Sequence, residues 1–160
     1  MNSPARTPLH AFRAASILPA AIALGYATAL SNATTALIDA RPQVSIPIFT
    51  TLSHSSALLM KTLPLMSTLA SLYLACVLPE CRTYWVVSSV AVGLGTVITA
   101  GISGPAAKKL VEIGARGQDA MDETEETLVH RDLLMRCVRG NYVRSFAYGV
   151  GTLTGMFAMY

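Results

Sequence analysis

The sequence predicts an all-α fold: an integral membrane four-helix bundle with an extra amphipathic helix in its third connector. Only 13% of the 160 residues are charged and 52% are hydrophobic, whereas about 25% are charged in a typical soluble domain. The mean hydropathy is +0.49. The charges gather in short connectors between long apolar stretches, each near the length of about 20 residues that a membrane-crossing helix needs. We expect a single membrane domain over residues 1–160.

The first apolar segment covers residues 14–36 and contains no charged side chain. A cleaved signal peptide is the alternative interpretation, because Arg6 and Arg13 precede an apolar run. The run is longer than the apolar core of a signal peptide, which favours a retained transmembrane helix.

Three further apolar segments follow, at residues 62–78, 83–103 and 142–160. The third segment opens with Tyr84-Trp85, an aromatic pair suited to the headgroup zone of a bilayer. Gly104-Pro105 is expected to end it, and the last segment carries Arg144 near its start. Small residues recur four positions apart, which lets helices approach closely in lipid: Gly25 with Ala29, Gly93 with Val97, and Gly151 with Gly155.

The connectors differ in composition. Residues 40–60 contain two prolines and a Ser/Thr-rich run, which predicts an extended or re-entrant segment. The connector 105–140 holds most of the charge, and its centre, residues 119–139, has helical composition with acids early and bases late. This amphipathic helix can continue into the last apolar segment. Lys and Arg favour the first and third connectors, so the positive-inside rule places both termini in the lumen and the charged connector in the cytosol.

Polar residues inside apolar helices are candidate functional residues, because they are costly in lipid. Arg144, with Asn141 one turn earlier, is the first candidate, and the alternative is that Arg144 snorkels to the interface. Asn32 in the first segment is the second, with a hydrogen bond between helices as the alternative. His54 and His130 are candidate bases near neutral pH.

Glu126 precedes His130 by one helical turn, which predicts either a base with raised basicity or a solvated ion pair. A third metal ligand is not evident, so no metal site is predicted. The net charge of +3, without a basic run or interleaved aromatics, does not favour nucleic acid as a partner. No glycine pattern follows a predicted strand, so no nicotinamide or flavin cofactor is expected.

Four stretches carry a family resemblance across nearly the whole chain. They are the segment 25–32, Val44-Ser45-Ile46-Pro47, the Pro105-containing exit from the third helix, and Gly140-Asn141-Tyr142-Val143-Arg144-Ser145. The last is similar to an Asn-x-x-Arg signature, and together they resemble the fungal anthrone oxygenases, small four-helix membrane proteins that accompany aromatic polyketide synthases. The family often has Trp four residues before this Asn, where this chain has Cys137.

The resemblance implies oxidation of a polyketide anthrone to an anthraquinone by dioxygen, without a cofactor, in secondary metabolism. It implies a multi-pass protein of the endoplasmic reticulum or vesicle membrane, associated with other enzymes of its pathway. His54 or His130 would then be the base, and Arg144 and Asn141 would face the developing oxyanion. Substrate contacts are expected from Asn32, Tyr26 and Tyr142.

Two other functions remain open from the sequence. A non-catalytic membrane scaffold would use the charged connector 105–140 to assemble other biosynthetic proteins. A transporter or channel subunit would need ionisable residues deep in several helices, whereas the second and third segments contain none between their ends.

Overall fold

The computed structural model describes residues 6–115 and 123–160, and these ranges are almost entirely helical. The elements in chain order are α1 (Arg6–Ala36), α2 (Pro42–Ala57), α3 (Leu59–Val77), the 3-10 turn η1 (Pro79–Cys81), α4 (Arg82–Ala115) and α5 (Glu123–Phe157). No strand occurs in the described ranges, which confirms the predicted all-α fold class.

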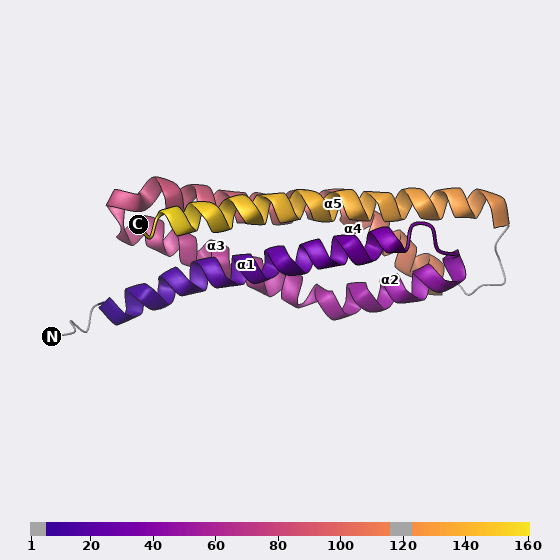
Figure 1. The fold of residues 1–160 in the computed structure, drawn as a ribbon, viewed down its shortest axis with the longest axis horizontal. Coiled ribbons are helices and arrows are strands. Elements are labelled where there is room, and N and C mark those ends of the chain that lie inside the picture. Colours follow the sequence, from indigo (N-terminus) through magenta and orange to yellow (C-terminus); the bar gives the residue numbers. More distant parts are fainter. Residues whose placement is uncertain (1–5, 116–122) are drawn as a thin grey trace.

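The helices form four long rods, because α2 and α3 follow one another almost without interruption (Figure 1). The rods lie along a common axis, and each runs antiparallel to the next in the chain. α5 packs against α1 and α4, and α3 packs against the same two helices. α4 and α5 have 34 and 35 residues, so each is about 50 Å long and exceeds the roughly 30 Å of a hydrocarbon core.

Three stretches are long and apolar enough to cross a membrane, namely Pro8–Ala36, Pro42–Val77 and Pro79–Ala115. They correspond to the first three predicted segments. The fourth predicted segment, 142–160, begins in the second half of α5. α5 as a whole carries more polar and charged side chains than the three stretches and is not one of them.

The first connector is helical from Pro42, so the predicted extended conformation at 40–60 is wrong, whereas a re-entrant course stays a prediction. α2 begins at Pro42, and proline suits the first turn of a helix because its missing N–H needs no partner there. The rod is interrupted only at Leu58. Pro64 lies inside α3, where it cannot donate to the carbonyl of Met60, so α3 lacks one backbone hydrogen bond in its first part.

The third helix does not end at Gly104-Pro105 as predicted, because α4 continues to Ala115. A proline removes one hydrogen bond, whereas ending a helix leaves four carbonyl groups without partners, so continuation costs less in apolar surroundings. The predicted amphipathic helix runs on into the last segment over the described residues, as the sequence allowed. From Glu123 onward it is continuous with the last segment as α5, and residues 119–122 lie outside the described ranges.

Gly151 and Gly155 lie at close contacts between helices, as the GxxxG spacing predicts. A Cβ on Gly151 would lie 2.5 Å from a methyl group of Val92, and one on Gly155 would lie 3.2 Å from Ile17. The absence of side chains therefore lets α5 approach both α4 and α1 closely. By contrast, a Cβ on Gly25 would have no neighbour within 4 Å, so the predicted contact through Gly25 is wrong.

The aromatic pair Tyr84-Trp85 separates into one exposed and one buried residue. Tyr84 is 49% exposed, as expected for a headgroup anchor, but Trp85 is completely buried against Leu74 and Ala158. Trp85 is therefore a core residue at this end of the rods. Successive residues of a helix are rotated by 100°, so Tyr84 and Trp85 face different surroundings. The side of α4 that Trp85 occupies is covered by α3 and by the end of α5.

Candidate functional site

Arg144 lies on the face of α5 that meets the other helices. Its neighbours along this face, Asn141, Ser145 and Tyr148, are all buried, and Arg144 itself is half-buried. Its Nε atom is buried and has no hydrogen-bond partner. Within the described residues no carboxylate lies within ion-pair distance of Arg144. A cation in this setting is expected to attract an anionic or oxyanionic ligand group.

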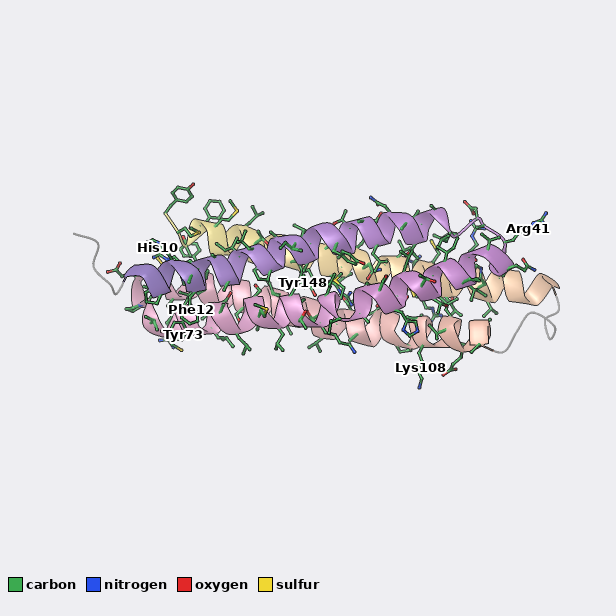
Figure 2. The ribbon with its side chains drawn as sticks, turned by 90° about the horizontal axis from the view of Figure 1, so that it is seen from below. His10, Phe12, Arg41, Tyr73, Lys108 and Tyr148 are labelled. Carbon is green, nitrogen blue, oxygen red and sulfur yellow. The ribbon has the colours of Figure 1, made fainter. Side chains whose placement is uncertain are left out.

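Tyr148 is the polar neighbour of Arg144, one helical turn further along α5. Its side chain is fully buried between the helices near the middle of their length (Figure 2). Its hydroxyl lies 2.9 Å from Oγ1 of Thr96 on α4, and Thr96 Oγ1 lies 2.9 Å from the Val92 carbonyl. Because Thr96 has one hydroxyl proton and donates it to that carbonyl, Tyr148 donates to Thr96. Both lone pairs of the Tyr148 oxygen can then accept hydrogen bonds.

Hydroxyl groups join α5 to its neighbours around this site. Thr99 Oγ1 lies 3.2 Å from the carbonyl oxygen of Gly140, and Thr28 Oγ1 lies 3.3 Å from Oγ of Ser145. Gly140 itself lies against Ser103, where a Cβ would approach within 2.8 Å. The segment Gly140–Ser145 is therefore held on both sides, by α4 and by α1. Such polar contacts between helices contribute to the packing of this part of α5 against its neighbours.

His130 does not join Arg144. It lies about four turns earlier on α5, on the order of 20 Å along the helix axis. Its Nε2 lies 2.7 Å from Oγ of Ser45 on α2, and both side chains are buried. Burial lowers the pKa of His130 below its ordinary value of about 6.5. Ser45 belongs to the Val44–Pro47 stretch, and its pairing with His130 was not predicted. The predicted partner Glu126 has its side chain outside the described part.

The remaining predicted residues lie apart from Arg144. Tyr142 Oη donates to Asn32 Oδ1 at 3.4 Å, and both residues are exposed where α5 meets α1. Tyr142 is two residues from Arg144, so it points about 160° away around the helix. His54 is exposed on α2, and Tyr26 is half-buried on α1.

Sequence reasoning missed Tyr148 as a site residue. The available signal was its spacing, since Tyr148 follows Arg144 by four positions and shares its helix face. A tyrosine in an apolar helix is common enough that spacing alone did not single it out. Its partner Thr96 lies on a different helix, and only the packing of α4 on α5 brings the two hydroxyls together.

Among the side chains that the structure describes, no group of three or more His, Cys, Asp or Glu residues is placed to hold a metal ion. No protein-family model, no curated protein and no solved structure matches this chain.

Proposed function

We propose that this protein is a multi-pass membrane enzyme that oxidises an anthrone to an anthraquinone with dioxygen, without a cofactor. One observation carries the proposal: Arg144 lies half-buried among apolar helices with an unpartnered Nε, beside the buried hydroxyl of Tyr148. The resemblance of residues 140–145 to the Asn-x-x-Arg signature of fungal anthrone oxygenases supports the same assignment.

Anthrone chemistry suits a site with one cation and few other groups. The methylene group between the two aromatic rings loses a proton, which leaves an electron-rich enolate with its negative charge on oxygen. A guanidinium in a low-dielectric setting stabilises such an oxyanion far more than it would in water. Arg144 is the proposed partner of this oxygen, and the Tyr148 hydroxyl and the Asn141 amide are proposed to orient the flat substrate.

The proposed reaction balances without a cofactor. The enolate reduces dioxygen, and a carbon–oxygen bond forms at the former methylene carbon to give a hydroperoxide. Loss of the remaining hydrogen from that carbon, with cleavage of the oxygen–oxygen bond, gives the second carbonyl group and one molecule of water. The substrate supplies all the electrons, one oxygen atom enters the quinone and the other leaves in water.

The first proton is proposed to pass to water at the exposed side of Arg144. His130 lies too far along α5 to receive it, and its Nε2 is already close to Ser45. His54 remains the alternative base, because its side chain is exposed on α2. A cation that lowers the energy of the enolate reduces the strength of base that the reaction requires.

We also propose that α5 completes a four-span bundle in the membrane of the endoplasmic reticulum or a vesicle. The outward face of α5 exposes large apolar side chains, with Phe146 77%, Leu153 58% and Phe157 66% exposed. Side chains of this size suit contact with lipid better than contact with water. Arg144 points to the opposite, inward side of the same helix.

The test measures oxygen consumption and quinone formation from an anthrone by the purified full chain in lipid nanodiscs. Anthrones oxidise slowly in air, so heat-inactivated protein sets the baseline. Arg144→Met should lower the rate at least about 100-fold, the effect of removing one oxyanion donor. Arg139→Met is the matched control, because Arg139 is exposed on the same helix, and its rate should stay near that of the unmodified protein. A wild-type rate equal to the baseline would favour the scaffold function instead.

A further inference from the structure

Charged residues are distributed unequally along the four parallel rods (Figure 1). Four stretches of the sequence contain no Asp, Glu, Lys or Arg, namely 14–38, 62–79, 83–107 and 145–160, and each lies mainly in a different rod. The stretches share one end of the rods, where Trp85 of α4 packs with Leu74 of α3, Ala158 beyond α5 and Leu9 of α1. This Trp85 end therefore begins a part of the rods without charged side chains.

Lys61 marks the far limit of this part on α3. Its side chain is exposed, and it lies about 10 Å along the helix from Thr68. A Cβ on Gly93 of α4 would lie 3.7 Å from Cγ2 of Thr68, so Gly93 and Thr68 lie at the same depth. Because α4 runs antiparallel to α3, Lys61 is level with the part of α4 about seven residues beyond Gly93, near Thr99.

Two exposed residues of α5 lie at the same depth as Lys61. Between them is Gly140, where a Cβ would lie 3.4 Å from Cγ2 of Thr99. Arg139 is exposed directly before Gly140, and Tyr142 is exposed after it and donates to Asn32 of α1 at 3.4 Å. Three rods thus expose polar side chains at one depth, which we name the polar level: Asn32, Lys61, Arg139 and Tyr142.

The distance between the Trp85 end and the polar level matches the thickness of a hydrocarbon core. Along α4, Thr99 and Ser103 lie about 26 and 32 Å from Arg82, at about 1.5 Å per residue. The core of a bilayer is about 30 Å thick. Large apolar side chains are exposed on all four rods within this distance, and they include Leu18, Leu69, Val97, Phe146 and Leu153.

Beyond the polar level the helices continue for about 20 Å, since α4 runs from Ser103 to Ala115 and α5 from Glu123 to Arg139. α2 packs on this continuation, where a Cβ on Gly114 would lie 2.8 Å from Ile46. The continuation exposes Lys108, Lys109, Arg131 and Arg136. Each Lys or Arg at the centre of a bilayer costs about 2.5–3.5 kcal/mol. A bilayer shifted toward this end would bury several such charges.

We propose that a lipid bilayer surrounds the rods only between Arg82 and the polar level, and that α2 and the adjoining ends of α4 and α5 project into water. This placement rests on the proposed four-span membrane bundle and adds its boundary. Although α2 is apolar in composition, it exposes Thr51 and His54, which suits contact with water. Arg144 is two residues from Tyr142 and lies just inside the boundary, where the proposed proton transfer to water requires it.

Two matched pairs of exposed positions test the boundary in the full chain in lipid nanodiscs. The first pair is Leu128→Cys and Leu153→Cys, which replace the same residue type on α5 at side chains that are 70% and 58% exposed. The second pair is Ile48→Cys on α2 and Val90→Cys on α4, at side chains that are 44% and 49% exposed. Because all four side chains are exposed, their replacement is compatible with folding.

Each introduced cysteine carries a nitroxide spin label. Saturation of its electron paramagnetic resonance signal measures collisions of the label with oxygen, which concentrates in hydrocarbon, and with a nickel chelate, which stays in water. Serine replaces Cys76 and Cys81 so that these residues take up no label, whereas Cys137 is buried and stays.

The ratio of oxygen to nickel collisions should be several times higher at the membrane member of each pair, Val90 or Leu153, than at its partner. Equal, lipid-like ratios at Ile48 and Val90, or at Leu128 and Leu153, would overturn the boundary and leave the membrane bundle intact. Water-like ratios at all four positions would overturn both. Oxygen consumption with an anthrone, measured on the same labelled proteins, reports separately on the Arg144 site.

Discussion

The Nε2 of His130 lies 2.7 Å from the Oγ of Ser45, a buried contact between α5 and α2 that joins residues 85 positions apart. Ser45 Oγ also donates to the carbonyl oxygen of Arg41 at 3.2 Å. Either atom can be the donor in the His130–Ser45 contact, depending on which ring nitrogen carries the proton. A neutral imidazole fits this buried contact.

The pH dependence of stability follows from this contact. Because burial lowers the pKa of His130 in the folded protein, the unfolded chain takes up a proton first as the pH falls. The contribution of His130 is therefore complete above about pH 6.5 and is lost progressively below it. Thermal unfolding in detergent at about pH 7.5 and about pH 5 should show a lower midpoint in acid. This shift should shrink in His130→Gln and persist in His54→Gln, because His54 is exposed. Equal shifts in both variants would contradict the assignment.

Glycine substitutions should distinguish close contacts from open surface. Gly151→Ala places a methyl group 2.5 Å from Val92 and 3.1 Å from the Ser88 carbonyl, and the backbone of α4 cannot yield easily. We expect it to lower the free energy of unfolding by about 1–3 kcal/mol. Gly25→Ala meets nothing within 4 Å and should be neutral or stabilise the helix by up to about 1 kcal/mol. Unfolding of both variants in mixed micelles measures the difference, and a neutral Gly151→Ala would show that α5 lies further from α4.

The proposed roles of two tyrosines are separable. Tyr148→Phe removes one hydrogen bond to Thr96, which keeps its bond to Val92, so stability should fall by only about 0.5–1.5 kcal/mol. Its rate of anthrone oxidation should fall at least about tenfold, because the hydroxyl beside Arg144 is lost. Tyr142→Phe also loses one hydroxyl, the donor to Asn32, but on the outer side of α5. Its rate should be unchanged, and parallel losses of rate would refute a specific role for Tyr148.

The adjacent aromatic residues Tyr84 and Trp85 should respond differently to truncation. Trp85→Ala empties a fully buried position beside Leu74 and Ala158 and should cost about 3–5 kcal/mol. Tyr84→Ala removes a half-exposed side chain and should cost less than about 1 kcal/mol. Resistance to unfolding by a denaturing detergent compares the two variants. Similar losses of stability would indicate that both rings lie at the membrane–water interface.

The helical nature of the chain and its three long apolar stretches were predictable, because hydropathy is a local property summed over about 20 residues. The ends of helices were harder to predict. Pro42 and Pro105 were interpreted as signals against helix, yet α2 begins at the first and α4 passes through the second. At Pro42 no hydrogen bond is lost, because the first turn of a helix has no partner for that N–H. At Pro105 the cost of one missing hydrogen bond is outweighed by the gain from continuing a helix that packs against its neighbours.

The sequence by itself determined an apolar, all-helical chain with Arg144 and Asn141 in its last helix and basic residues concentrated toward one end. Tertiary structure alone decided which polar groups meet: His130 lies against Ser45, Tyr142 against Asn32, and Tyr148 against Thr96 beside Arg144. The physical reason is that helix rotation and axial offset depend on the fit of side chains between helices. A rotation of 100° per residue turns two neighbouring positions, such as Tyr84 and Trp85, to opposite environments.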